Sequence, residues 1–168
     1  MTRRLRCCDL VTALLLVLVT ARPVHACCAV SSSGLAFGTY QSLTFAGKLS
    51  SADVSSAGIV SVVCSGIATG GDYTIALGPS MAGSGDRIST RYLANPNGGE
   101  LMMFNVYTDY NRSTVWGDGT TGAVLSGSIA AGASNQSQAV YGKIPAGQYR
   151  LRAGGFSSAL TMTVTYNP

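Results

Sequence analysis

The residue types that usually carry out catalysis are few in this chain. The only histidine is His25, which lies in an N-terminal segment that we expect to be removed. Serine and cysteine nucleophiles usually rely on an imidazole base, and catalytic zinc usually has a histidine ligand. Six carboxylates remain beyond that segment, scattered at turn-like positions: Asp53, Asp72, Asp86, Glu100, Asp109 and Asp118. We interpret them as turn carboxylates that accept backbone amides, and the sequence predicts no enzyme.

Metal and ligand sites are equally sparse. Neither Asp72 nor Asp118 is followed by the run of oxygen ligands that calcium requires, so we expect no metal and no cofactor. Trp116 is the only tryptophan, in the run Val115-Trp116-Gly117-Asp118-Gly119. Its ring either packs over a turn, the interpretation we favour, or stacks on a sugar as a surface binding residue in an exposed loop.

The first 26 residues have the features of a secretory signal peptide. Arg3, Arg4 and Arg6 precede Leu10 to Val19, an uncharged run of ten residues, and Val24-His25-Ala26 places small residues at a cleavage site. The run is about half of the roughly 20 residues that span a bilayer, so we expect no transmembrane helix. We therefore divide the chain into a signal peptide, 1–26, and one domain, 27–168. Cleavage after Ala21 is a weaker alternative.

Export has two consequences for charge and redox state. The signal peptide carries away much of the positive charge, and the basic and acidic residues that remain are nearly balanced, so nucleic acid is not an expected partner. Cys27, Cys28 and Cys64 remain in a compartment where disulfides persist. Val60, Val62 and Cys64 share one face of a strand, which directs Cys64 into the core. Its partner is Cys27 or Cys28.

The periodicity along residues 27–168 predicts strands and turns. Apolar residues recur with period two, in runs bounded by Gly, Asn, Asp and Pro. The clearest are Ile59 to Cys64, Tyr73 to Leu77, Leu101 to Tyr107, Ala139 to Ile144 and Leu160 to Tyr166. No segment of helical length keeps an apolar stripe. We predict a single all-β sandwich of about six or seven strands, without linker or repeat.

A set of motifs follows in order along the chain: Cys28, Leu35-Ala36-Phe37-Gly38-Thr39-Tyr40, Gly58 to Cys64, Arg91-Tyr92-Leu93, Leu101, Phe104-Asn105-Val106-Tyr107, Asp109, Trp116-Gly117-Asp118-Gly119, Tyr141-Gly142-Lys143-Ile144-Pro145-Ala146-Gly147-Gln148 and the terminal alternating strand. These motifs extend over nearly all of residues 27–168. The ordered set resembles the spore coat protein U domain, which is found in subunits of archaic chaperone-usher pili and in related secreted coat proteins.

The resemblance implies an immunoglobulin-like sandwich that lacks one strand, with a groove for a donor strand beside the last strand. We assign Leu160, Met162, Val164 and Tyr166 to that groove, which a chaperone would cover before a neighbouring subunit fills it. The implied partners are a periplasmic assembly chaperone, an outer-membrane usher and neighbouring pilin-like subunits. The implied route is through the periplasm to the cell surface or an extracellular fibre or coat.

Three expectations follow. Cys28 should pair with Cys64, which leaves Cys27 as a free thiol, in an intermolecular bridge or lipidated. The chain should act as a structural subunit without catalysis. It should accept a strand without donating one, at a fibre end, because cleavage after Ala26 leaves only Cys27 before the bridged Cys28. The alternatives are a self-contained adhesin-like module that binds a glycan or surface, and a lipidated surface protein.

Overall fold

The computed structural model describes residues 27–42 and 52–168, with Cys27 described by its backbone only. Within these ranges the protein contains strands and irregular segments and no helix. In particular, these ranges hold no helix of the length and apolarity needed to cross a membrane. The predicted signal peptide lies outside the described residues.

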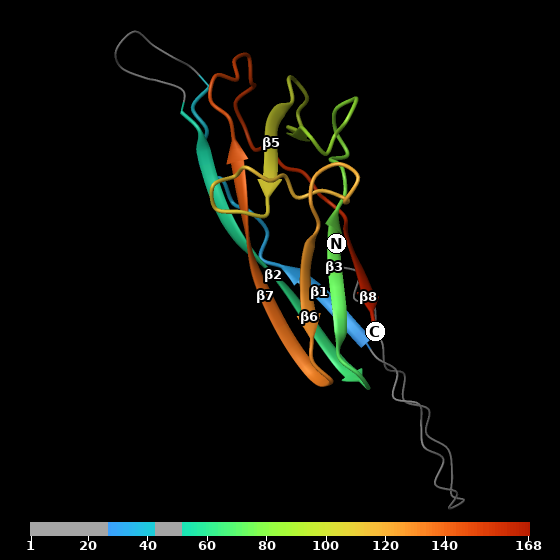
Figure 1. Cartoon of the computed structure of the whole chain (residues 1–168). Coiled ribbons are helices and arrows are strands. Elements are labelled where there is room, and N and C mark those ends of the chain that lie inside the picture. The colour runs from blue at the N-terminus through green and yellow to red at the C-terminus, as the bar shows by residue number, and fades with distance from the viewer. Residues whose placement is uncertain (1–26, 43–51) are drawn as a thin grey trace, which may run out of the picture.

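The strands form two antiparallel sheets that make up a sandwich (Figure 1). The larger sheet has the order β1 (Cys27–Ser32), β2 (Val54–Ile67), β7 (Gly132–Ile144), β5 (Met102–Tyr107) and β4 (Arg91–Leu93). The smaller sheet has the order β6 (Leu125–Ile129), β3 (Gly71–Leu77) and β8 (Met162–Asn167). The long strands β2 and β7 pair over most of their length and curve together along one side of the molecule (Figure 1).

The core follows the alternation that the sequence predicts. On β2, Val60, Val62 and Cys64 are buried, while Ile59 and Val63 on the opposite face are exposed. The described residues form eight strands, more than the six or seven expected. Two of the strands without a predicted run are short: β4 has three residues, and β6 has the sequence Leu-Ser-Gly-Ser-Ile. β4 is too short for a period of two to stand out, and in β6 a glycine occupies the middle position where an apolar side chain would mark the period.

A disulfide joins Cys28 to Cys64 and confirms the predicted pairing. The two residues lie directly opposite each other in the antiparallel pair of β1 and β2, with their Cα atoms 4.1 Å apart. The bridge therefore fixes the first strand to the edge of the larger sheet. The side chain of Cys27 lies outside the described part of the chain, and its three interpretations stay open.

The two sheets do not cover each other completely. Buried core residues on β2, β3, β5, β6 and β7 pack together, but the apolar residues near β1 and β8 are only half-buried. They come from two places: Cys28, Val30, Leu35, Phe37 and Tyr40 on one side, and Leu151, Phe156, Leu160, Met162, Val164 and Tyr166 on the other. The fold is thus the expected all-β, immunoglobulin-like sandwich, incomplete along one side.

Candidate functional site

An apolar groove of about 960 Å³ lies on the incomplete side of the sandwich. One wall is the irregular segment after β1, residues 32–42, and the other is the segment that leads into β8, residues 151–162. We call them the N-terminal wall and the C-terminal wall. Core residues from both sheets and from the connections between strands form the floor: Leu77, Leu93, Met102, Phe104, Val106, Trp116, Val140 and Ile144. The groove therefore reaches down to the core itself.

The N-terminal wall is attached to β2 at its start. The Ser33 amide donates to the Ile59 carbonyl over 3.0 Å, and the Ile59 amide donates to the Ser33 hydroxyl over 2.9 Å. Further along, the Phe37 ring meets the Phe104 ring edge to face, with centroids 6.0 Å apart. The wall therefore presents apolar side chains to the core without joining the sheet as a regular strand.

Two buried glycines give the N-terminal wall its place. A Cβ atom at Gly142 on β7 would lie 2.6 Å from the Phe37 ring and 2.9 Å from the Leu35 side chain. A Cβ atom at Gly58 on β2 would collide with the carbonyl oxygen of Gly34. Because only glycine leaves this space empty, the wall packs directly on the backbone of the larger sheet.

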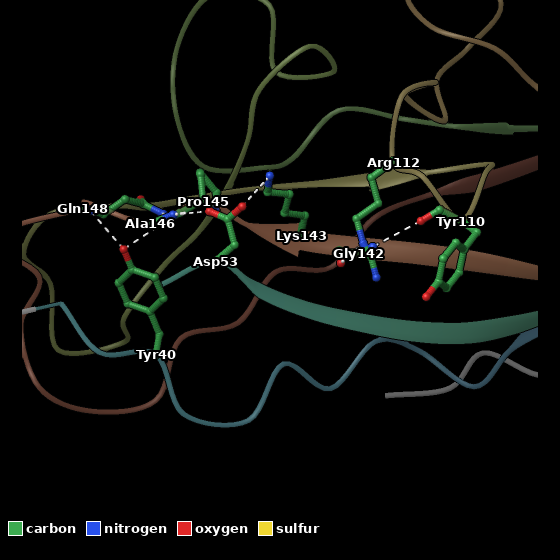
Figure 2. A network of polar contacts seen from close by, with 9 residues as sticks. All are labelled: Tyr40, Asp53, Tyr110, Arg112, Gly142, Lys143, Pro145, Ala146 and Gln148. Atoms are coloured by element: carbon green, nitrogen blue, oxygen red, sulfur yellow. Dashed lines mark hydrogen bonds and ion pairs between the residues drawn. The ribbon is translucent and has the colours of Figure 1, made fainter. Parts of the chain in front are cut away.

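Tyr40 fixes the far end of the N-terminal wall (Figure 2). Its hydroxyl donates to the Pro145 carbonyl over 3.0 Å and accepts from the Gln148 amide over 2.9 Å. The Gln148 side chain is buried, accepts from the Met103 amide over 2.6 Å and donates to the Met103 carbonyl over 2.9 Å. Tyr40, the turn after β7 and β5 are therefore joined in one hydrogen-bond network.

The same turn carries an ion pair on the neighbouring surface (Figure 2). Lys143 lies 2.6 Å from Asp53, which also accepts from the Ala146 amide over 2.8 Å. The hydrogen bond from Lys143, followed by that from Ala146, lowers the pKa of Asp53. Both side chains are well exposed, so we expect the pair to orient the turn more than to stabilise the fold.

The C-terminal wall is attached to both sheets. Ser157 and Ala94 exchange two backbone hydrogen bonds of 2.9 and 3.0 Å, and the Gly78 amide donates to the Thr161 carbonyl over 2.9 Å. Leu151, Phe156 and Leu160 on this wall are half-buried beside the groove. The wall thus continues into β8, whose only strand partner among the described residues is β3.

The structure separates the four predicted groove residues into two pairs. Leu160 and Met162 line the groove. Val164 and Tyr166 lie further along β8, half-buried against the core but outside the groove lining. The Tyr166 hydroxyl donates to the Thr69 carbonyl over 3.0 Å. The sequence analysis thus named Leu160 and Met162, which line the groove, but it did not single out the rest of the two walls, because neither has a regular period.

Trp116 lies where the favoured of its two interpretations places it, in the core. Its side chain is only 2% exposed, and its indole nitrogen donates to the Ile75 carbonyl over 2.9 Å. A ring with this burial has no free face for a sugar at the surface, so the other interpretation, a surface binding residue, is wrong for Trp116. The ring forms part of the groove floor.

Arg91 is a buried residue that the sequence analysis did not single out for a structural role. It is 0% exposed and donates to the carbonyls of Leu77 and Trp116 over 2.9 Å each, and to the Asn105 side chain over 2.6 Å. Burial lowers the pKa of Arg91 to about 10, so the guanidinium stays charged at neutral pH. The only sequence signal was its place in the Arg91-Tyr92-Leu93 motif of the resemblance. Arg91 holds two residues of the groove floor together.

Three carboxylates support turns, as the sequence analysis interpreted them. Asp86, Asp109 and Asp118 each accept backbone amides within their own turns, and these or neighbouring hydroxyl hydrogen bonds lower the pKa of each. Asp118, for example, accepts from the amides of Thr120 and Thr121 over 2.9 and 2.7 Å. Across residues 27–42 and 52–168, no three potential metal ligands among His, Cys, Asp and Glu come together.

Comparison with solved structures finds a similar chain in the crystal structure of the CsuC–CsuE chaperone–tip adhesion subunit pre-assembly complex, from archaic chaperone-usher Csu pili of Acinetobacter baumannii. The sequence identity is 16% and the TM-score 0.48, over 83% of this chain and 40% of that chain. This chain thus spans less than half of the length of that one. No curated protein matches it. Residues 12–163 match the family described as Spore Coat Protein U domain, and the chain therefore belongs to this family.

Proposed function

We propose that this protein is a non-catalytic structural subunit of a secreted surface fibre or coat, and that its groove accepts a β-strand from another chain. One observation carries the proposal. A groove of about 960 Å³ lies between the two walls, core residues such as Leu93 and Phe104 form its floor, and β8, where one wall ends, pairs only with β3 among the described strands. Membership of the Spore Coat Protein U domain family supports the same proposal.

The chemistry of the groove suits strand addition. An added strand gains main-chain hydrogen bonds from a sheet edge, and its alternate side chains enter apolar pockets. Leu160 and Met162 line the groove where β8 begins, and no described strand pairs with the edge of β8 that faces away from β3. The proposed partners are a periplasmic assembly chaperone, an outer-membrane usher and neighbouring subunits, on a route through the periplasm to the cell surface.

We further propose that this subunit accepts a strand and donates none. The predicted cleavage after Ala26 leaves Cys27 ahead of the bridged Cys28, and residues 27–32 are already paired with β2 as β1. A donor needs about five free residues with alternate apolar side chains. A place at a fibre end, or in a coat outside any polymer, fits this restriction.

A solubility experiment tests whether the groove is an uncovered apolar surface that a partner must cover. Expressed alone in an oxidising compartment, the chain should aggregate through its apolar groove, and co-expression with a cognate chaperone should rescue it. Met162→Asp should abolish the rescue, because the charge enters the groove without a partner. Thr163→Asp is the matched control, because Thr163 is exposed and should leave the rescue intact.

Two results would contradict the proposal. A lone chain that is soluble, monomeric and cooperative in melting, and that takes up no strand, would mean that the sandwich is self-sufficient. For the acceptor role, chaperone-bound protein is mixed with a synthetic donor peptide from a neighbouring subunit. Uptake of the peptide without homopolymers is expected, whereas ladders of homopolymer from this chain alone would exclude the acceptor-only role.

A further inference from the structure

Arg152 is the only charged residue among the described residues that line the groove. The other lining residues are apolar, glycine, or neutral residues such as Ser158 and Gln41. Arg152 is exposed and donates from Nη1 to the Asn97 carbonyl over 2.6 Å, and no ion pair involving it occurs among the described residues. The groove therefore carries one positive charge that no acidic side chain balances.

Arg152 lies where the C-terminal wall begins, beside the connection between β4 and β5. Its Nη1 atom donates to the Asn97 carbonyl in this connection, and a Cβ atom at Gly99 would lie 3.3 Å from the Arg152 Cβ atom. The C-terminal wall then continues to Met162, where β8 begins. The groove is therefore charged where this wall begins and uncharged where it reaches β8.

We propose that Arg152 pairs with an acidic residue at one end of the inserted strand and so sets the direction and register of that strand; this inference rests on the proposed function. Apolar pockets alone accept an alternating segment in either direction and after a shift of two residues, because the side-chain period is two. A single charge pair at one position makes one strand direction and one register more favourable than the others. The expected occupant is an alternating apolar segment with Asp or Glu at the end that reaches Arg152.

Synthetic peptides test the inference on the full chain purified with its chaperone, because the chain alone is expected to aggregate. Four peptides of about nine residues have Val or Ile at alternate positions, Thr between them and blocked termini. One carries Glu at its N-terminal end, one Glu at its C-terminal end, one Gln at both ends and one Lys at both ends. Binding is measured by fluorescence anisotropy. One Glu peptide should bind about threefold more tightly than the Gln peptide, because exposed ion pairs contribute little, and the advantage should shrink between about 50 mM and about 500 mM NaCl.

Variants assign the effect to Arg152. Arg152→Gln should remove the advantage of the Glu peptide, and Arg152→Glu should transfer the preference to the Lys peptide. Arg150→Gln is the control, because Arg150 is exposed two residues away but does not line the groove. Equal binding of all four peptides to the unaltered chain, or equal effects of Arg150→Gln and Arg152→Gln, would overturn the inference and leave the proposed function standing. Failure of every peptide to bind would overturn both.

Discussion

Strands β3 and β8 lie side by side in one sheet and point matched residues at the same core, yet they differ in burial. Tyr73 pairs with Tyr166, Ile75 with Val164 and Leu77 with Met162. The three residues on β3 are 1%, 1% and 4% exposed, whereas their partners on β8 are all half-buried. The difference does not come from the pattern, because β8 has the cleaner alternation of apolar residues and threonine.

The difference comes from the neighbours. β3 has β6 on one side and β8 on the other, while β8 has β3 alone among the described strands. The other side of β6 is protected differently: the Gln138 side chain on β7 donates to the Ser126 carbonyl and to the Tyr73 hydroxyl, over 2.9 Å each. One edge of the small sheet is thus tied to the large sheet, and the other is left open. The burial of an apolar strand depends on a neighbour at each edge as much as on the opposite sheet.

The largest expected loss of stability is found by comparing alanine variants of the paired tyrosines Tyr73 and Tyr166. Tyr73→Ala should lower the free energy of unfolding by about 4 kcal/mol, because a large side chain leaves a cavity in a closed core. Tyr166→Ala should lower it by about half as much, since the half-buried site is already partly solvated. Urea unfolding of both variants with the disulfide intact measures the ratio. Equal losses would contradict the interpretation that β8 lacks a neighbour.

A somewhat smaller effect concerns the end of β3. Arg91 donates to the Leu77 carbonyl at the end of β3, and Leu77 pairs with Met162 at the start of β8. Arg91→Met should reduce the free energy of unfolding by about 3 kcal/mol, because it leaves several buried acceptors without donors, although it also removes a buried charge. Arg150→Met, at an exposed site, is the control. If Arg91→Met leaves the free energy of unfolding unchanged in urea, the hydrogen bonds of Arg91 do not stabilise the end of β3.

Removing the protection of β6 should have a modest effect on stability and a visible one on association. Gln138→Ala leaves the Ser126 carbonyl and the Tyr73 hydroxyl without their donor, at a cost of about 1 kcal/mol. An unprotected edge should also promote self-association, measurable by light scattering. Gln136→Ala, on the same face of β7 but exposed, should do neither. If both variants show the same light scattering, Gln138 does not protect the β6 edge of the small sheet from self-association.

The smallest effect is on acid stability. Backbone amides of Thr121 and Thr120 lower the pKa of Asp118 from the ordinary 3.8, in a turn where the Gly117 carbonyl accepts from the Leu77 amide of β3. Because the pKa is lower in the folded state, the contribution of Asp118 is present above pH 3.8 and disappears as the pH falls through the lowered value. Melting temperatures of Asp118→Asn should decline less steeply below pH 3.8 than those of the unaltered chain. An identical decline would exclude this role of Asp118.

The sequence predicted the parts of this molecule that repeat with period two. The buried face of Val60, Val62 and Cys64 follows directly from alternation, and the last predicted run differs from β8 by two residues at its start and one at its end. The strand that borders the groove was therefore predictable. The choice of Cys28 over Cys27 depended on the family resemblance, since adjacent residues differ only in which face they take.

Alternation of apolar and polar residues could not predict the two groove walls or the burial of Arg91. Residues 33–42 and 151–158 are placed by single contacts such as those of Tyr40 and Ser157, which leave no period in the sequence. Arg91 stands in a strand of three residues, and its burial depends on carbonyls brought from Leu77 and Trp116. Such contacts become visible only when distant segments are assembled.

The empty spaces at Gly58 and Gly142 have a consequence for sequence variation. Neither position lines the groove, yet a single methyl group at either would push the N-terminal wall off the larger sheet and change the width available to a bound strand. Both sites should therefore tolerate only one amino acid in a working subunit, and a library randomised at these two codons should return glycine almost alone.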